Sequence, residues 1–106
     1  MGVSRLAKET GRRGCMACSE ETLRAFFSRP ENYVNLSLEA IIERIGPFSQ
    51  YDDWDWGREV YDWKRPHLRI RVVMRGGYVK AVEELDPQDN SRYGTTLRVL
   101  WGDVSP

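Results

Sequence analysis

The sequence has little of the chemistry on which most enzymes and metal sites depend. Its 106 residues include one histidine, His67, and two cysteines, Cys15 and Cys18. It has no nucleophile motif and no Gly-rich phosphate loop, so it offers no catalytic triad and no nucleotide site. A zinc site needs four ligands, and a second cysteine pair is missing. We therefore predict a protein that is not an enzyme, with no catalytic residues, no metal and no cofactor.

A net charge and a long hydrophobic run are missing too. The 16 basic residues balance the 16 acidic ones, so no overall electrostatic attraction to nucleic acid is predicted. No apolar run is long enough to span a bilayer, and no hydrophobic signal region stands near the start. The sequence as written predicts a cytosolic protein, or an exported one if a signal peptide has been removed. We expect a protein partner and no membrane span.

The length allows one domain with a single two-layer core. Residues 1–18 are poor in large apolar side chains and richer in basic than in acidic ones, which predicts a mobile basic arm. The domain is predicted over 19–102, with a tail over 103–106.

Cys15 and Cys18 form a C-x-x-C pair in the arm. Such a pair can be a redox dithiol or, in a dimer, half of a metal site. In thioredoxin-like proteins a strand stands immediately before the pair, and this sequence has no strand pattern there. We therefore interpret the two thiols as having no function.

Two amphipathic helices are predicted in the first half of the chain. Ser19 is a suitable N-cap for the first helix, and Pro30 ends it. Ser37 or Asn35 caps the second, and Gly46 suits the left-handed position at its end. The apolar faces follow helical spacing and consist of Leu23, Phe26 and Phe27 in the first helix and Leu38, Ile41, Ile42 and Ile45 in the second.

The clearest structural signal is an antiparallel meander between Trp54 and Leu85. Gly76 and Gly77 suit a two-residue hairpin turn, because glycine adopts positive φ without a Cβ clash. The turn predicts the pairs Arg75 with Tyr78, Met74 with Val79, Val72 with Ala81, Ile70 with Glu83 and Arg69 with Glu84. Glu83 then falls on the apolar face. We expect it at the sheet margin or re-aimed by a β-bulge, and not buried without a partner.

The strand before this hairpin spans residues 59–64, and a fourth strand spans 95–101. An even-numbered loop around Pro66 predicts the pairs Trp63 with Ile70, Tyr61 with Val72 and Asp62 with Arg71. The fold class is therefore α+β: two helices followed by a four-stranded antiparallel meander sheet, in a two-layer sandwich.

Acidic and aromatic residues interleave in a predicted loop after the second helix. The candidate partner-binding residues there are Tyr51, Asp52, Asp53, Trp54, Asp55 and Trp56. A calcium loop of the EF-hand type is excluded, because its twelfth position would be Lys64 instead of Glu. In the simpler interpretation one tryptophan anchors the loop and the aspartates are solvated. In the functional one the loop recognises a partner, because Trp and Tyr dominate binding hot spots. The enzymatic alternative is a hydrolase with a pair of carboxylates from among Asp52, Asp53, Asp55 and Glu59.

The second candidate surface is the sheet face away from the helices, which the alternation predicts to be exposed and basic. Its candidate partner-binding residues are Arg69, Arg71, Arg75 and Tyr78. This face suits an acidic partner or, as a weaker alternative, single-stranded nucleic acid stacked on its aromatic groups. The neutral overall charge argues against nucleic acid. The simpler interpretation is a solvated face whose arginines pair with nearby acids.

Residues 35–47 (NLSLEAIIERIGP) resemble the G-M-T-x-x-E-V-x-x-x-L-G-x-P helix of the SmpA/OmlA (BamE-like) lipoproteins, which recurs in the beta-lactamase-inhibitor-like fold. The strand residues that match the outline of this family are Tyr61, Trp63, Val72, Gly77 and Val79. The resemblance covers roughly half of the chain and implies a non-catalytic protein-binding module. Asn35 replaces the first glycine of the motif, and one residue is missing between Gly46 and Pro47. No hydrophobic segment precedes Cys15, so lipid anchoring is not implied.

We therefore predict a small non-catalytic protein-binding or inhibitory module. A small immunity-like or antitoxin-like protein is the alternative, because an acidic aromatic loop can plug a basic active site.

Overall fold

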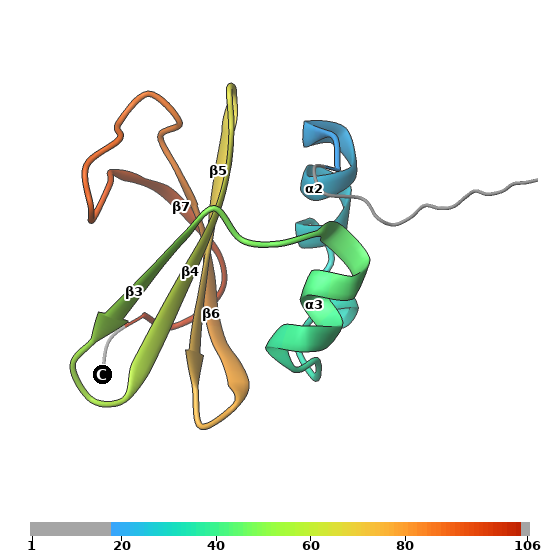
Figure 1. The fold of residues 1–106 in the computed structure, drawn as a ribbon, viewed down its shortest axis with the longest axis vertical. Coiled ribbons are helices and arrows are strands. Elements are labelled where there is room, and N and C mark those ends of the chain that lie inside the picture. The colour runs from blue at the N-terminus through green and yellow to red at the C-terminus, as the bar shows by residue number, and fades with distance from the viewer. Residues whose placement is uncertain (1–17, 105–106) are drawn as a thin grey trace, which may run out of the picture.

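The structure, a computed structural model, describes residues 18–104. An antiparallel sheet of five strands in the order β3-β4-β5-β6-β7 carries both α-helices on one face (Figure 1). The elements in chain order are α2 (Glu20–Phe27), the short 3-10 helix η1 (Pro30–Asn32), α3 (Leu38–Ile45), β3 (Gln50–Trp54), β4 (Arg58–Arg65), β5 (Leu68–Arg75), β6 (Tyr78–Leu85) and β7 (Thr96–Gly102). The α+β class is confirmed.

Both helices begin where the sequence predicts. The hydroxyl of Ser19 accepts a hydrogen bond from the backbone of Thr22, and Ser37 caps α3 in the same way through Ala40. Gly46 ends α3 with φ of 87°, a conformation that costs glycine little. Each α-helix has eight residues. In the part of the chain that the structure describes, neither is long and apolar enough to cross a membrane.

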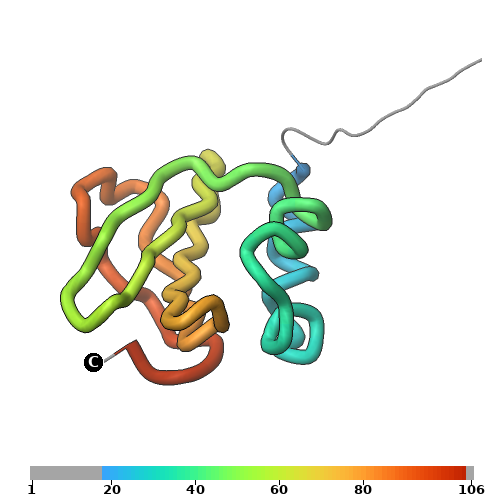
Figure 2. Tube along the Cα trace, turned by 60° about the horizontal axis from the view of Figure 1, so that its bottom comes forward, coloured from blue at the N-terminus to red at the C-terminus, as the bar shows by residue number. Residues whose placement is uncertain are grey.

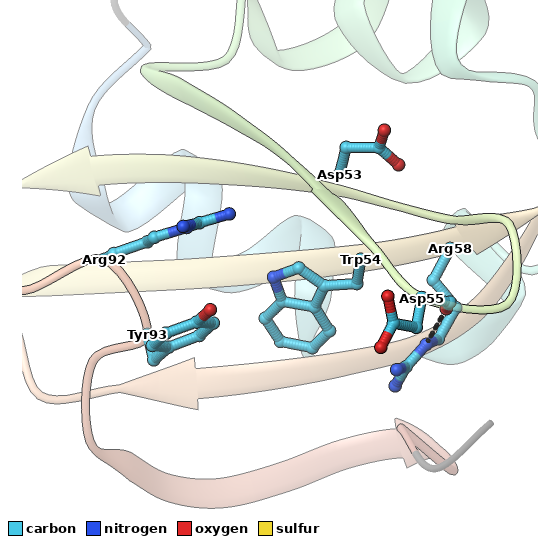
Figure 3. Close-up of a pocket in the computed structure, with 6 residues that line it drawn as sticks. All are labelled: Asp53, Trp54, Asp55, Arg58, Arg92 and Tyr93. Atoms are coloured by element: carbon cyan, nitrogen blue, oxygen red, sulfur yellow. Dashed lines mark hydrogen bonds between the residues drawn. The ribbon is translucent and has the colours of Figure 1, made fainter.

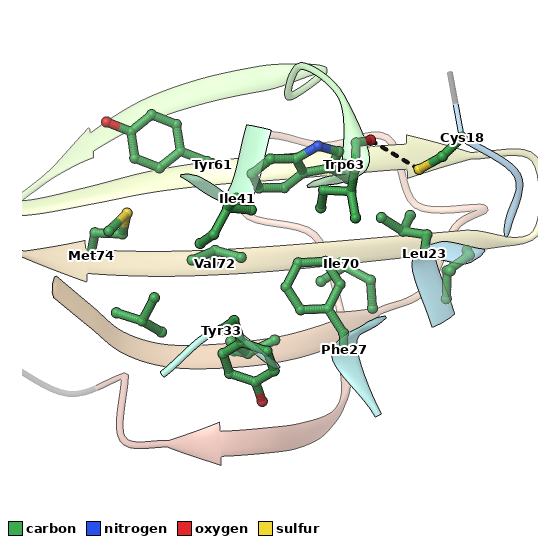
Figure 4. Close-up of a cluster of buried hydrophobic side chains, with 14 residues drawn as sticks. Cys18, Leu23, Phe27, Tyr33, Ile41, Tyr61, Trp63, Ile70, Val72 and Met74 are labelled. Carbon is green, nitrogen blue, oxygen red and sulfur yellow. Dashed lines mark hydrogen bonds between the residues drawn. The ribbon is translucent and has the colours of Figure 1, made fainter. Parts of the chain in front are cut away.

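The main core lies between the helices and the sheet (Figure 4). Trp63 is fully buried there, and its indole N–H donates a 3.0 Å hydrogen bond to the carbonyl oxygen of Gly46. Phe27 packs against the same ring, with 6.1 Å between ring centroids. The thiol of Cys18 is buried and donates a 2.9 Å hydrogen bond to the carbonyl oxygen of Ile45. Cys15 and the other residues of the predicted arm up to 17 lie outside the described residues, as do 105–106 of the predicted tail.

The prediction of four strands is wrong, because part of the predicted acidic loop is the edge strand β3. Its Tyr51 lies opposite Tyr61 of β4, with ring centroids 5.2 Å apart. Aspartate is depleted in strands, so two adjacent aspartates, Asp52 and Asp53, hid this strand from the sequence pattern. Its position at the edge, where one side has no neighbouring strand, suits charged residues.

The predicted register between β4 and β5 is confirmed, including the pairs Trp63 with Ile70 and Asp62 with Arg71. Between β5 and β6 only the pairs nearest the turn are confirmed, and the more distant ones are wrong by one residue. A register shift between Val73 and Met74 brings Glu83 opposite Arg71. The shift moves the carboxylate off the apolar face, as the bulge alternative predicted. Glu83 is still buried there, and its carboxylate accepts a hydrogen bond from the hydroxyl of Thr96, so it is not buried without a partner.

The prediction that the arginine face of the sheet is exposed is wrong for Arg69 and Arg71. Their exposed fractions are 1% and 2%, although Arg75 and Tyr78 at the end of the face are exposed. The segment 86–95 between β6 and β7 folds over this face, on the side away from the helices (Figure 2). We call residues 86–95 the covering loop.

Candidate functional site

A buried ionic cluster explains why the arginine face is covered. The carboxylate of Asp62 accepts hydrogen bonds of 2.7 and 3.0 Å from Arg69, and of 2.8 and 3.0 Å from Arg71. Two buried guanidiniums are tolerable only when a carboxylate and further acceptors surround them. The side chain of Asp62 lies on the same face of the sheet as those of both arginines, because Asp62 is paired with Arg71 and Arg69 lies two residues before Arg71 on β5. The cluster therefore follows from the confirmed register.

The remaining acceptors come from the backbone of the covering loop. Arg69 donates to the carbonyl oxygens of Asp89 and Ser91, and Arg71 donates to that of Tyr93 at 2.7 Å. Both guanidiniums also contact the carbonyl oxygen of Arg92. The two arginines therefore hold a segment without regular secondary structure in a defined position, and in the folded chain they are not available to a partner.

A second link joins the covering loop to β3. The carboxylate of Asp52 accepts two hydrogen bonds of 2.7 Å from Arg92 and one of 3.0 Å from the indole N–H of Trp54. The hydrogen bonds from Arg92 are the largest reason that the pKa of Asp52 lies well below its usual range. The same bonds raise the pKa of Arg92. Both groups thus stay charged at neutral pH, and the link persists.

A pocket of about 380 Å³ lies beside this link (Figure 3). The residues that line it are Asp53, Trp54, Asp55, Arg58, Arg92 and Tyr93. On its other side Arg58 donates a 2.7 Å hydrogen bond to the carbonyl oxygen of Val104. The rings of Trp54 and Tyr93 have centroids 6.1 Å apart and planes tilted by 46°. The sequence pattern missed Arg58, Arg92 and Tyr93 as site residues, because only the docked covering loop brings them together.

The predicted acidic loop is divided among three places. Asp52 and Trp54 are half-buried and point toward the covering loop, where they stabilise the fold. Tyr51 and Asp53 alternate with them and are exposed on the edge strand. Desolvation, followed by the charges of neighbouring acids, raises the pKa of Tyr51, so its hydroxyl stays protonated at neutral pH.

Asp55 and Trp56 occupy the third place, the turn between β3 and β4. Trp56 is 67% exposed and has φ of 70°, and it is the one non-glycine residue with positive φ among residues 18–104. Gly57 follows it with φ of 72°. A bulky residue in the left-handed region is strained, since its Cβ approaches the following carbonyl. The turn therefore presents an indole to solvent from an unfavourable backbone conformation.

The turn between β5 and β6 lies at the same end of the sheet (Figure 1). In the register of the sheet, Arg58 lies opposite Trp54 and Arg75, and Arg75 in turn lies opposite Tyr78. Tyr78 is 69% exposed. The structure thus brings four of the predicted binding residues to one end of the sheet, and we call Asp55, Trp56, Arg75 and Tyr78 the tip surface.

Residues 18–104 contain no group of three His, Cys, Asp or Glu side chains that could hold a metal ion. Comparisons of the chain with protein-family models, with curated proteins and with solved structures found no match.

Proposed function

We propose that this chain is a small protein-binding module that contacts its partner through the tip surface. The observation that carries the proposal is Trp56, which is 67% exposed and held at φ of 70°. Tryptophan and tyrosine are enriched among the residues that dominate binding energy, and the tip surface exposes one of each, Trp56 and Tyr78.

Hydrogen bonds hold both ends of the turn that carries Trp56, which favours binding. Trp54 lies two residues before Trp56 and is fixed by its hydrogen bond to Asp52. Arg58 lies two residues after it and donates to the carbonyl oxygens of Asp55 and Val104. A loop held in one conformation loses little conformational entropy when a partner binds.

The two predicted surfaces contribute unequally to this proposal. Arg69 and Arg71 serve the fold, so they are left out, and single-stranded nucleic-acid binding loses two of its four predicted contact residues. If the partner is an enzyme, the proposed binding module would be an immunity-like or antitoxin-like inhibitor. The two α-helices lie on one face of the antiparallel sheet, and this arrangement supports the predicted two-layer sandwich. The SmpA/OmlA-like resemblance implies the same role of a binding module, but through its architecture alone.

The proposal is tested by affinity capture from the source cell with Trp56→Gly. Glycine removes the indole and suits the left-handed backbone, so the variant keeps its fold. The control is Leu97→Ser, because Leu97 is another exposed apolar residue, 55% exposed, on β7. We expect the same protein to be captured by wild type and by Leu97→Ser but not by Trp56→Gly. Equal capture by all three would contradict the proposal, as would capture of no protein by wild type.

A further inference from the structure

The pocket beside Trp54 and Tyr93 is a second site, which shares Asp55 but none of the other three residues with the tip surface. Its volume of about 380 Å³ is within the usual range for small-molecule sites, about 300–1,000 Å³. It lies between two polar links, Asp52 with Arg92 on one side and Arg58 with the carbonyl oxygen of Val104 on the other. Both links are formed without a ligand, so the shape of the pocket exists before anything binds.

The aromatic rings of the pocket do not favour a cationic ligand. The guanidinium carbons of Arg58 and Arg71 lie 5.3 and 5.1 Å from the centroid of the Trp54 ring. Arg92 lies 5.2 Å from the centroid of the Tyr93 ring. A ligand ammonium would need these same ring faces and would meet three positive charges there.

Arg58 is the cation of the pocket that forms no ion pair with a carboxylate among residues 18–104. Its Nε and Nη1 donate to main-chain oxygens of Asp55 and Val104. Within residues 18–104, no carboxylate lies at ion-pair distance from Arg58, and its Nη2 has no hydrogen-bond acceptor. Its neighbour across the sheet is Arg75, a second cation, which adds to the positive potential. Arg92, by contrast, is neutralised by Asp52.

Two carboxylates line the pocket, and they differ in orientation. Figure 3 shows the side chain of Asp53 on the side of β3 away from the pocket, whereas that of Asp55 lies on the side of Arg58. Asp55 makes no ion pair with Arg58. Its negative charge therefore opposes the binding of an anion in the pocket but does not pair with Arg58.

We propose that the pocket binds a small monocarboxylate with a planar apolar body. The carboxylate accepts a charge-assisted hydrogen bond from Nη2 of Arg58, and the apolar body lies against the Trp54 and Tyr93 rings. Two main-chain acceptors already fix the guanidinium, so binding requires little ordering of the Arg58 side chain. This inference does not depend on the proposed function, because none of the exposed aromatic groups of the tip surface lines the pocket.

The test compares three probes that share one ring: benzoate, benzamide and benzylammonium. Binding is followed by NMR at the Trp54 indole N–H and the Arg58 Nε–H of the full chain. Benzoate should give saturable shifts at both positions. The other two probes should bind at least about tenfold more weakly, because benzylammonium has no acceptor for Arg58 and the neutral benzamide accepts a hydrogen bond without the attraction between opposite charges.

Variants identify the residue that binds. Arg58→Gln should weaken benzoate binding about tenfold or more, whereas Arg75→Gln, which removes the neighbouring charge outside the pocket, should weaken it less than about threefold. Asp55→Asn should strengthen it and leaves the main-chain acceptor of Arg58 in place, so it tests the proposal even if Arg58→Gln does not fold. The inference is overturned if benzylammonium binds best, if benzoate and benzamide bind equally, if Asp55→Asn weakens benzoate binding, or if no probe gives saturable shifts.

Discussion

The carboxylate of Asp52 on β3 is bonded twice, at 2.7 Å each time, to the guanidinium of Arg92, which lies 40 residues later in the covering loop. The same carboxylate accepts a hydrogen bond from Trp54, so one acidic side chain fixes the edge strand, the covering loop and one wall of the pocket. The edge strand and the covering loop therefore depend on each other.

Replacing Asp52 with asparagine should loosen this link. The Asp52 side chain is mostly buried and that of Arg92 is exposed, so solvent screens part of the attraction. We expect Asp52→Asn to lower the free energy of unfolding by about 1 kcal/mol, measured by urea denaturation. Asp53→Asn is the matched control, because Asp53 is exposed and lies opposite another acid, Glu59. Its removal should be neutral or slightly stabilising, and an equal loss in both variants would contradict the role given to Asp52.

The acid sensitivity of the fold should depend on the same region. Hydrogen bonds from Arg92 lower the pKa of Asp52, and the hydroxyl of Thr95 is the main cause that lowers the pKa of Asp89 to about 2. A carboxyl whose pKa is depressed in the folded state contributes stability that is fully present above the pKa of the same carboxyl in the unfolded chain, which is about 4. That stability is lost as the pH falls through the folded pKa.

Urea unfolding between about pH 5 and pH 2 should therefore show a progressive loss of stability below about pH 4. The slope against pH should be shallower in Asp52→Asn, because this variant no longer has the carboxyl whose pKa the hydrogen bonds from Arg92 lower. Identical slopes for the variant and wild type would contradict this prediction, because they would mean that Asp52 has the same pKa in the folded and the unfolded protein.

The buried cluster should be far less tolerant than the Asp52 link. Asp62→Asn leaves Arg69 and Arg71 buried without their carboxylate, so we expect a loss of about 3–5 kcal/mol in the free energy of unfolding. The covering loop should also become more sensitive to limited proteolysis, since the two guanidiniums that hold it lose their position. Asp55→Asn, an exposed control, should change stability by less than about 0.5 kcal/mol. A loss below about 1 kcal/mol in Asp62→Asn would contradict the assigned role of the cluster.

The strain at Trp56 has a separate signature. Trp56→Ala and Trp56→Gly both remove the indole, but only glycine adopts φ of 70° without a Cβ clash. We expect Trp56→Gly to be more stable than Trp56→Ala by about 1 kcal/mol in urea denaturation. If alanine proves equally stable, the turn relaxes at no cost and Trp56 is not strained.

The sequence allows the helices and the centre of the sheet to be predicted for local reasons. Ser19, Ser37 and Gly46 mark the helix ends through contacts within a few residues, and the turn at Pro66 sets the register of Trp63 against Ile70. These features depend on neighbours in the chain, which a sequence pattern records.

The features that could not be predicted depend on contacts between distant residues. The strand over Gln50–Trp54 is polar and is held by β4 and by Arg92 in the covering loop. The burial of Arg69 and Arg71 requires the backbone of the covering loop, which has no apolar pattern of its own. The pocket follows from both. Alternation of apolar and charged residues predicted an exposed face because it cannot show that main-chain oxygens from elsewhere satisfy the arginines.

We propose that Trp56 contributes energy to partner binding and not to the stability of the fold. This role is tested most directly by the affinity of the captured partner for wild type and for Trp56→Gly, measured by calorimetry beside the urea unfolding of both proteins. We predict that Trp56→Gly loses at least about 2 kcal/mol of binding free energy, as for a hot-spot residue, while its free energy of unfolding is unchanged or higher. Equal affinity for the two proteins would contradict the claim.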